Sequence, residues 1–209
     1  MQAHSLKTQV YEGILNDILE GVYQPNSIIN EKHLIDQYKV SKTPVREALV
    51  QLCSEGVLNN IPRFGYQVSV ITPSEIVEMI EYRKVIEVAS LEMCFDSLTE
   101  EQISELKELN ECNKRLTDSQ DAKLHWNANQ KFHKKLGSFC ENRYLIKSLE
   151  DSLKACTRIS NQYFVKVWES HEEEDGDHYK LVQALEEKNL ERAKQILIYD
   201  IELMKKKML

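Results

Sequence analysis

The sequence predicts a mainly α-helical protein, with an N-terminal winged helix-turn-helix that carries a small β-hairpin and a C-terminal all-α bundle of about six helices. Two observations lead to this fold class. Helical patterns of apolar residues run along most of the chain, and two short β-prone runs flank a Pro/Gly turn near residue 63. A length of 209 residues fits one small and one mid-sized domain, which we place at residues 1–71 and 72–209.

The first domain begins with three predicted helices. Apolar residues recur at helical spacing from Val10 to Leu19, and the segment 21–26, with its Gly and Pro, should end this helix. A second, short helix fits Glu31 to Tyr38. Ser41 is suited to cap a third helix, which runs from Lys42 to near Glu55.

A hairpin is predicted after the third helix. The runs Val57–Ile61 and Tyr66–Val70 are β-prone, and Pro62–Gly65 supplies the turn between them. Three helices followed by a hairpin give the element order of a winged helix-turn-helix.

The second domain is predicted to be helical throughout. Thr72–Glu75 and Thr99–Gln102 both have the pattern of a capping box, which marks the start of a helix. The remaining helices fit residues 121–138, 142–168, 174–187 and 190–206.

The composition is that of an ordinary globular protein. Hydrophobic residues make up 42% of the chain, and no apolar run approaches the ~18 residues that a membrane span needs. The N-terminal segment lacks the apolar core of a signal peptide, so we expect a cytoplasmic protein. The five cysteines include no C-x-x-C pair, and we expect them to be reduced thiols.

The negative charge of the chain lies mainly in the second domain. The whole chain has a formal net charge of −7, whereas residues 1–72 hold six Lys and Arg against seven Asp and Glu, a net charge of −1. A nucleic-acid contact in the first domain would therefore depend on a few well-placed cations.

The third predicted helix has the residues that a DNA-reading helix needs. Such a helix inserts its N-terminal end into the major groove, with hydroxyl groups near phosphates and long cations at base edges. Ser41, Lys42, Thr43 and Arg46 meet this need, and Arg63 at the hairpin tip is placed to act as a wing. The alternative is a purely structural role, in which Ser41 caps the helix and Arg46 pairs with a nearby acid.

Several motifs of the first domain occur in the order and spacing of a known family. Gly21–Pro25, Asn30–Leu34, Val40–Leu49 and Glu55–Leu58 together resemble the GntR family of bacterial regulators, although Asn26 departs from the usual glycine. The resemblance implies a DNA-binding domain at residues 1–71. It assigns DNA-contacting roles to Lys32, Ser41, Lys42, Thr43, Arg46, Phe64 and Gly65.

The second domain is similar to the effector-binding domain of the FadR subfamily. The matching motifs are Tyr82–Ala89, Phe132–Leu136 and His178–Leu185. Many members of that subfamily hold a divalent metal on one Asp and three His, and the positions that match here are Asn129, His133, His178 and Asp200. The first and last of these depart from the family pattern. Two imidazoles and two oxygen ligands suit Zn, Ni or Mn, and the alternative is that both histidines are ordinary bundle residues.

Arg83 is the candidate effector contact. It lies near the centre of the first bundle helix between Ile80 and Ile86, and the resemblance implies small organic acids, whose carboxylate an arginine can bind bidentately. The alternative is a salt bridge with Glu87, four residues further along the helix.

These observations favour a ligand-responsive DNA-binding transcription regulator. We expect a repressor that a small organic acid in the bundle releases or modulates, acting as a homodimer on a palindromic double-stranded operator. One alternative is a constitutive DNA-binding protein whose helical domain only dimerises. Another is a metal-dependent hydrolase, but no nucleophile or general-base motif accompanies the metal positions, so we do not expect an enzyme.

Overall fold

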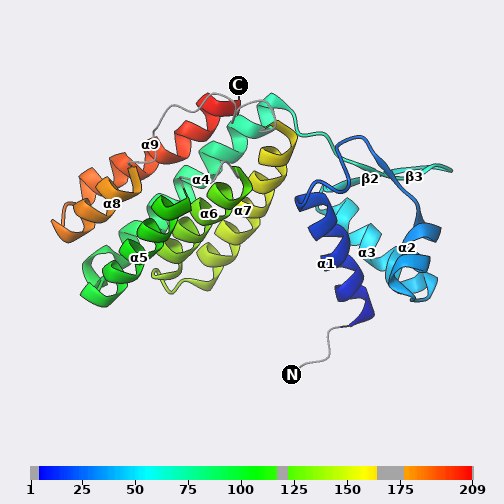
Figure 1. Cartoon of the computed structure of the whole chain (residues 1–209), viewed down its shortest axis with the longest axis horizontal. Coiled ribbons are helices and arrows are strands. Elements are labelled where there is room, and N and C mark those ends of the chain that lie inside the picture. The colour runs from blue at the N-terminus through cyan, green and yellow to red at the C-terminus, as the bar shows by residue number, and fades with distance from the viewer. Residues whose placement is uncertain (1–4, 117–121, 164–176, 209) are drawn as a thin grey trace. The chain divides into compact units, whose positions relative to one another are not determined.

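The computed structural model describes residues 5–116, 122–163 and 177–208 of the chain. The chain divides into two compact units, Met1–Thr72 and Pro73–Leu209 (Figure 1). Each unit is described below by itself.

The first unit combines three helices with a small antiparallel sheet. The helices are α1 (Leu6–Leu19), α2 (Glu31–Tyr38) and α3 (Lys42–Ser54), and the strands are β1 (Ile28–Ile29), β2 (Leu58–Ile61) and β3 (Gly65–Val68). The strand order is β1-β3-β2, so the predicted hairpin of β2 and β3 is present. The two-residue strand β1 was not predicted, and it pairs Ile29 with Tyr66 on the outer side of β3.

Side-chain caps begin two of the three helices. The Ser5 hydroxyl accepts the Thr8 N–H at 3.1 Å, and the Asn30 side chain accepts the Lys32 N–H at 2.8 Å. Ser41 stands at the N-cap position of α3, as predicted, but its hydroxyl makes no capping hydrogen bond. The start of the third helix is therefore open to solvent.

One hydrophobic core holds the first unit together. Helix α3 turns an apolar stripe inward, where Val45, Ala48, Leu49 and Leu52 are all 0% exposed. These side chains pack with residues of the other two helices and of the sheet, such as Ile14, Leu34 and Leu58. Because this stripe takes up one face of α3, the residues between its members face outward.

The second unit is a helical bundle. Its described residues form a 3-10 turn, η1 (Phe95–Ser97), and six α-helices: α4 (Pro73–Cys94), α5 (Glu100–Leu116), α6 (Ala122–Ser138), α7 (Arg143–Tyr163), α8 (Asp177–Glu186) and α9 (Leu190–Met208). The all-helical prediction is confirmed. The predicted helical residues 164–168 and 174–176 lie outside the described part of the chain.

The predicted capping box at the start of α5 is present in full. The Gln102 N–H donates to the Thr99 hydroxyl at 3.2 Å, and the Thr99 N–H donates to the Gln102 side chain at 3.0 Å. Helix α4 packs against α6, α7 and α9, and α5 packs against α6 and α8. This arrangement places the middle of α4 inside the bundle.

Two expectations from composition can be compared with the structure. All five cysteines are free thiols, and Cys94, Cys140 and Cys156 are buried. Among the described residues, no helix combines the length and the apolar character needed to cross a membrane.

Candidate functional site

The predicted DNA-contacting residues of α2 and α3 all lie on the exposed surface of the first unit. They are Lys32, Ser41, Lys42, Thr43 and Arg46. The last four fall within the first turns of α3, opposite its buried apolar stripe. The N-terminal end of α3 thus presents two hydroxyl groups and two cations to solvent, as a major-groove reading helix requires.

Glu31, the first residue of α2, forms ion pairs with both cations of α3. Its Oε1 lies 3.2 Å from Lys42 Nζ, and its Oε2 accepts a hydrogen bond from Arg46 Nε at 3.1 Å. The side chain of Glu31 is 20% exposed, whereas those of Lys42 and Arg46 are each 60% exposed. The acid that the structural alternative required for Arg46 is therefore present, although Arg46 remains accessible from solvent.

The hairpin tip is a tight turn that projects an aromatic side chain. The Phe64 N–H donates to the Ile61 carbonyl at 3.0 Å, and Arg63 has a φ of 71°. Gly65 has a φ of 126°, and a Cβ at this position would lie 2.7 Å from the carbonyl oxygen of Ile29. Phe64 is 72% exposed. The turn therefore needs glycine at one position and presents Arg63 and Phe64 outward.

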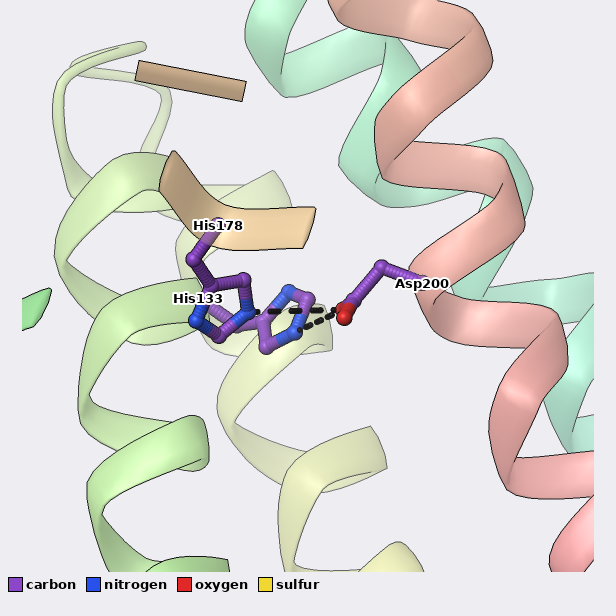
Figure 2. Close-up of side chains that lie close together, drawn as sticks. All are labelled: His133, His178 and Asp200. Carbon is purple, nitrogen blue, oxygen red and sulfur yellow. Dashed lines mark ion pairs between the residues drawn. The ribbon is translucent and has the colours of Figure 1, made fainter. Parts of the chain in front are cut away.

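The four predicted metal-ligand positions come together inside the second unit. His133 of α6, His178 of α8 and Asp200 of α9 place their ligand atoms within 4.8 Å of one another. Figure 2 shows the Asp200 carboxylate facing both imidazoles, with its Oδ2 2.8 Å from His133 Nε2 and 3.4 Å from His178 Nε2. The Asn129 amide nitrogen lies 3.5 Å from the same nitrogen of His178.

Aromatic packing and a second carboxylate fix the orientation of the two histidines. The ring of His178 stacks on Phe132, with centroids 4.0 Å apart. On the other side of the His133 ring, Nδ1 lies 2.6 Å from Glu87 Oε2. His133 is 1% exposed and Glu87 is 3% exposed, so this contact is fully buried. A carboxylate in this position is the usual partner of a metal-binding histidine.

Glu87 also binds Arg83, the candidate effector contact. Arg83 Nε donates to Glu87 Oε1 at 2.7 Å, and Arg83 is 2% exposed. Its Nη2 lies 2.6 Å from the same oxygen but makes no hydrogen bond to it or to another described residue. The predicted alternative for Arg83, a salt bridge with Glu87, is therefore present, and part of the guanidinium still lacks an acceptor.

The charges of this cluster shift the pKa values of its members. Burial alone would lower the pKa of His133, but the Glu87 carboxylate and the hydrogen bonds to Asp200 and Glu87 raise it to about 9. Burial works against the charged forms of Glu87 and Asp200 as well. Arg83 and His133 nevertheless lower the pKa of Glu87, and His178 and His133 lower that of Asp200. The cluster is therefore charged at neutral pH.

The residues present fit a divalent transition metal. Two imidazole nitrogens and a carboxylate oxygen converge, which is the nitrogen-and-oxygen ligand set that Zn, Ni and Mn accept. Asn129 turns its amide nitrogen toward His178, and a half-turn of the amide would present the oxygen instead. A metal would take the His133 nitrogen that now pairs with Asp200, so it would compete with a proton for that atom.

Two known families match this chain. The gntR family of bacterial regulatory proteins matches residues 6–68, and the FCD domain matches residues 78–203. The uncharacterized HTH-type transcriptional regulator YdhC of Bacillus subtilis (strain 168) is 31% identical over 193 residues, which span 90% of this chain and 84% of that protein. The chain belongs to the GntR family of bacterial transcriptional regulators.

Solved structures share the fold of this GntR regulator along nearly its whole length. McbR/YncC of E. coli superposes with a TM-score of 0.82 at 22% identity, covering 96% of this chain and 95% of that chain. A GntR protein of Rhodococcus sp. RHA1 gives a TM-score of 0.80 at 22% identity, with coverages of 97% and 96%. The matching families and the named relatives are regulators of transcription, so the chain is a DNA-binding regulator and not an enzyme.

Two carboxylates make contacts in these sites that were not predicted from the sequence of the regulator. Glu31 pairs with cations 11 and 15 positions away, and Glu87 contacts a histidine 46 positions away. Helical spacing revealed only the contact of Glu87 with Arg83, because the other contacts join different helices.

Proposed function

We propose that this regulator is a ligand-responsive repressor of the FadR subfamily, acting in the cytoplasm and released from its operator by a small organic acid bound in the helical unit. The observation that carries the proposal is the buried charged cluster of Arg83, Glu87, His133 and Asp200. Burying charges costs several kcal/mol per ion even after relaxation. A bundle that served only to dimerise would gain nothing from that cost.

The cluster has free hydrogen-bonding capacity for an acid. The Nη2 of Arg83 is ion-paired with Glu87 Oε1 but makes no hydrogen bond to a described residue, and a carboxylate is the acceptor that suits a guanidinium best. Buried polar groups without partners cost about 1–3 kcal/mol each, so a ligand that satisfies them gains that amount.

A bound divalent metal supports the same function. Asn129, His133, His178 and Asp200 would hold the ion, and Glu87 would orient His133. The ion would supply a positive charge that binds an organic acid. Zn, Ni and Mn all suit this ligand set.

We place the contacts with the operator on the first unit. We assign phosphate contacts to Lys32, Ser41 and Thr43, base contacts to Lys42 and Arg46, and wing contacts to Arg63, Phe64 and Gly65. In a homodimer, two α3 helices would enter successive major grooves of a palindromic site. A coupling of about 1–3 kcal/mol between acid and operator binding suffices for regulation.

An exposed apolar stripe on α4 supports the homodimer. Tyr82, Val85 and Met93 share one face of this helix and are 44%, 69% and 56% exposed. A charge in the centre of such a stripe should disrupt pairing, because an interface core excludes unpaired charges. We expect Val85→Glu to shift the protein from dimer to monomer in sedimentation equilibrium, whereas Val50→Glu, at a valine of α3 that is 60% exposed, leaves the dimer intact.

A thermal-shift screen of small carboxylic acids, run with and without added Zn, Ni or Mn, tests ligand binding. A stabilising acid should also release a labelled operator duplex. Arg83→Lys should abolish that stabilisation, because lysine keeps a positive charge beside Glu87 but has no planar fork. Arg143→Lys, at an exposed arginine, serves as the matched control. Stabilisation that persists in Arg83→Lys contradicts the contact, and a screen with no hit favours the constitutive alternative.

Metal analysis of the purified protein tests the ion site separately. The wild type should retain a stoichiometric transition metal that is lost in His133→Ala and His178→Ala, because each change removes one imidazole ligand. His33→Ala, at an exposed histidine of α2, should retain the metal. Equal metal content in all four proteins would exclude the site.

A further inference from the structure

Glu31 lies between the two cations that we assign to base contacts, and the family resemblance gave this residue no DNA-contacting role. Each oxygen of its carboxylate binds a different cation, Oε1 to Lys42 Nζ and Oε2 to Arg46 Nε. One acid thus links two side chains that stand four residues apart on the same face of α3.

The carboxylate of Glu31 is itself held in place. Glu31 is the first helical residue of α2, directly after the Asn30 cap, where the positive end of the helix dipole favours a negative charge. Its side chain is only 20% exposed, although both cations are 60% exposed. The acid is therefore the more buried member of this group, and each of the two long, exposed side chains pairs with it.

The contact with Glu31 leaves the DNA-reading atoms of Arg46 available. Only Nε is used, and no other hydrogen bond of the guanidinium is found among the described residues. Both Nη groups can therefore still bind guanine O6 and N7. Holding the side chain in advance reduces the conformational entropy that is lost when DNA binds.

The same carboxylate opposes binding that depends on phosphates alone. Non-specific DNA binding depends on cations near the phosphate backbone, and the first unit has a net charge of only −1 to begin with. A negative charge between Lys42 and Arg46 weakens that attraction for every sequence equally. Base contacts, which need the directed Nη groups, are retained.

We propose that Glu31 is a specificity-determining positioning residue, which directs Lys42 and Arg46 toward base edges and disfavours their use on phosphates. The proposal rests on the DNA-contacting roles proposed above for these two cations. An exposed ion pair contributes only about 0.2–1 kcal/mol to the stability of a protein. We therefore assign Glu31 a role in DNA discrimination more than in folding.

The test compares the affinities of the full-length protein for two DNA duplexes. One is selected by the wild type from a random-sequence library, and the other is a shuffled duplex of equal length and composition. Fluorescence anisotropy at one near-physiological salt concentration gives both affinities. We expect Glu31→Ala to tighten binding to the shuffled duplex about threefold and to lower the ratio of selected to shuffled affinity about tenfold.

Two further variants separate charge from positioning. Asp36→Ala removes the same charge from an exposed site on the same helix, so the affinity ratio should stay within about twofold of wild type. Glu31→Gln keeps an acceptor for Arg46 Nε, so its ratio should fall between those of the wild type and Glu31→Ala. An unchanged ratio in Glu31→Ala, or an equal fall in Asp36→Ala, overturns the proposal.

Arg46→Ala distinguishes failure of this inference from failure of the DNA-contact assignment. If Arg46 contacts bases, Arg46→Ala should remove the preference for the selected duplex. Loss of preference in Arg46→Ala with no effect of Glu31→Ala overturns only the role of Glu31. Retained preference in Arg46→Ala overturns the DNA-contact assignment and the role of Glu31 with it.

Discussion

At the scale of single residues, the buried cluster is balanced in charge. Arg83 and a protonated His133 carry two positive charges, and Glu87 and Asp200 carry two negative ones. Each carboxylate contacts at least one cation directly. Removing one member therefore leaves a buried charge without its partner, which costs more than the pair itself contributes.

Glu87→Gln should destabilise the helical unit by about 3–5 kcal/mol, because Arg83 and His133 would then share one remaining carboxylate. Urea denaturation of the metal-free protein measures this loss. Glu202→Gln is the matched control, since Glu202 pairs with Lys84 at 2.9 Å but is 44% exposed, and it should cost less than about 1 kcal/mol. Similar losses in both variants would show that burial does not set the cost.

The residues of this cluster were predictable from the sequence only in part. The resemblance to a known domain located His133, His178 and Asp200, and helical spacing gave the pairing of Arg83 with Glu87. The contact of Glu87 with His133 was not predicted, because it joins α4 to α6 and depends on how those helices pack.

At the scale of secondary-structure elements, local signals explain most of the predicted fold. Capping residues and the 3.6-residue period located α1 to α3 and the starts of α4 and α5 within a few positions. Strand β1 was missed because two residues are too few to show an alternating pattern. It forms only through pairing with β3, whose partner residues lie 37 and 39 positions further along the chain.

Strand β1 sets a steric requirement at the wing. Ala at position 65 would be strained at a φ of 126° and would collide with the Ile29 carbonyl, so Gly65→Ala should cost about 2–4 kcal/mol. Gly56 has a φ of 67° with nothing within 4 Å of a Cβ, so Gly56→Ala should cost only the strain, about 1–2 kcal/mol. Thermal unfolding of the two variants measures the difference. An equal loss of stability in the two variants would mean that strand β1 moves away from the added Cβ without a loss of free energy.

At the scale of the whole molecule, the chain has two units, and the first has a core of its own. That core is built from residues between Val10 and Val68 alone. The two units also differ in net charge, since residues 1–72 account for only −1 of the total of −7. The two units can therefore be perturbed separately.

Damage to one core should leave the other unit folded. Leu52→Ala removes a side chain that is 0% exposed in the first unit, and Leu149→Ala removes one that is 1% exposed in the second. Each should cost about 2–5 kcal/mol. Amide hydrogen exchange should accelerate between α1 and β3 in Leu52→Ala and between α4 and α9 in Leu149→Ala. Acceleration of both units in either variant would contradict separate folding.

The bare start of α3 has a consequence for how this helix meets DNA. The Ser41 hydroxyl makes no capping hydrogen bond, so it satisfies none of the N–H groups that the first turn of a helix leaves without an intrahelical partner. A phosphate oxygen would fill that role, since helix N-termini favour anions. We therefore expect a phosphate oxygen of the operator to accept from these N–H groups, so that the nucleic acid would supply the cap that Ser41 does not.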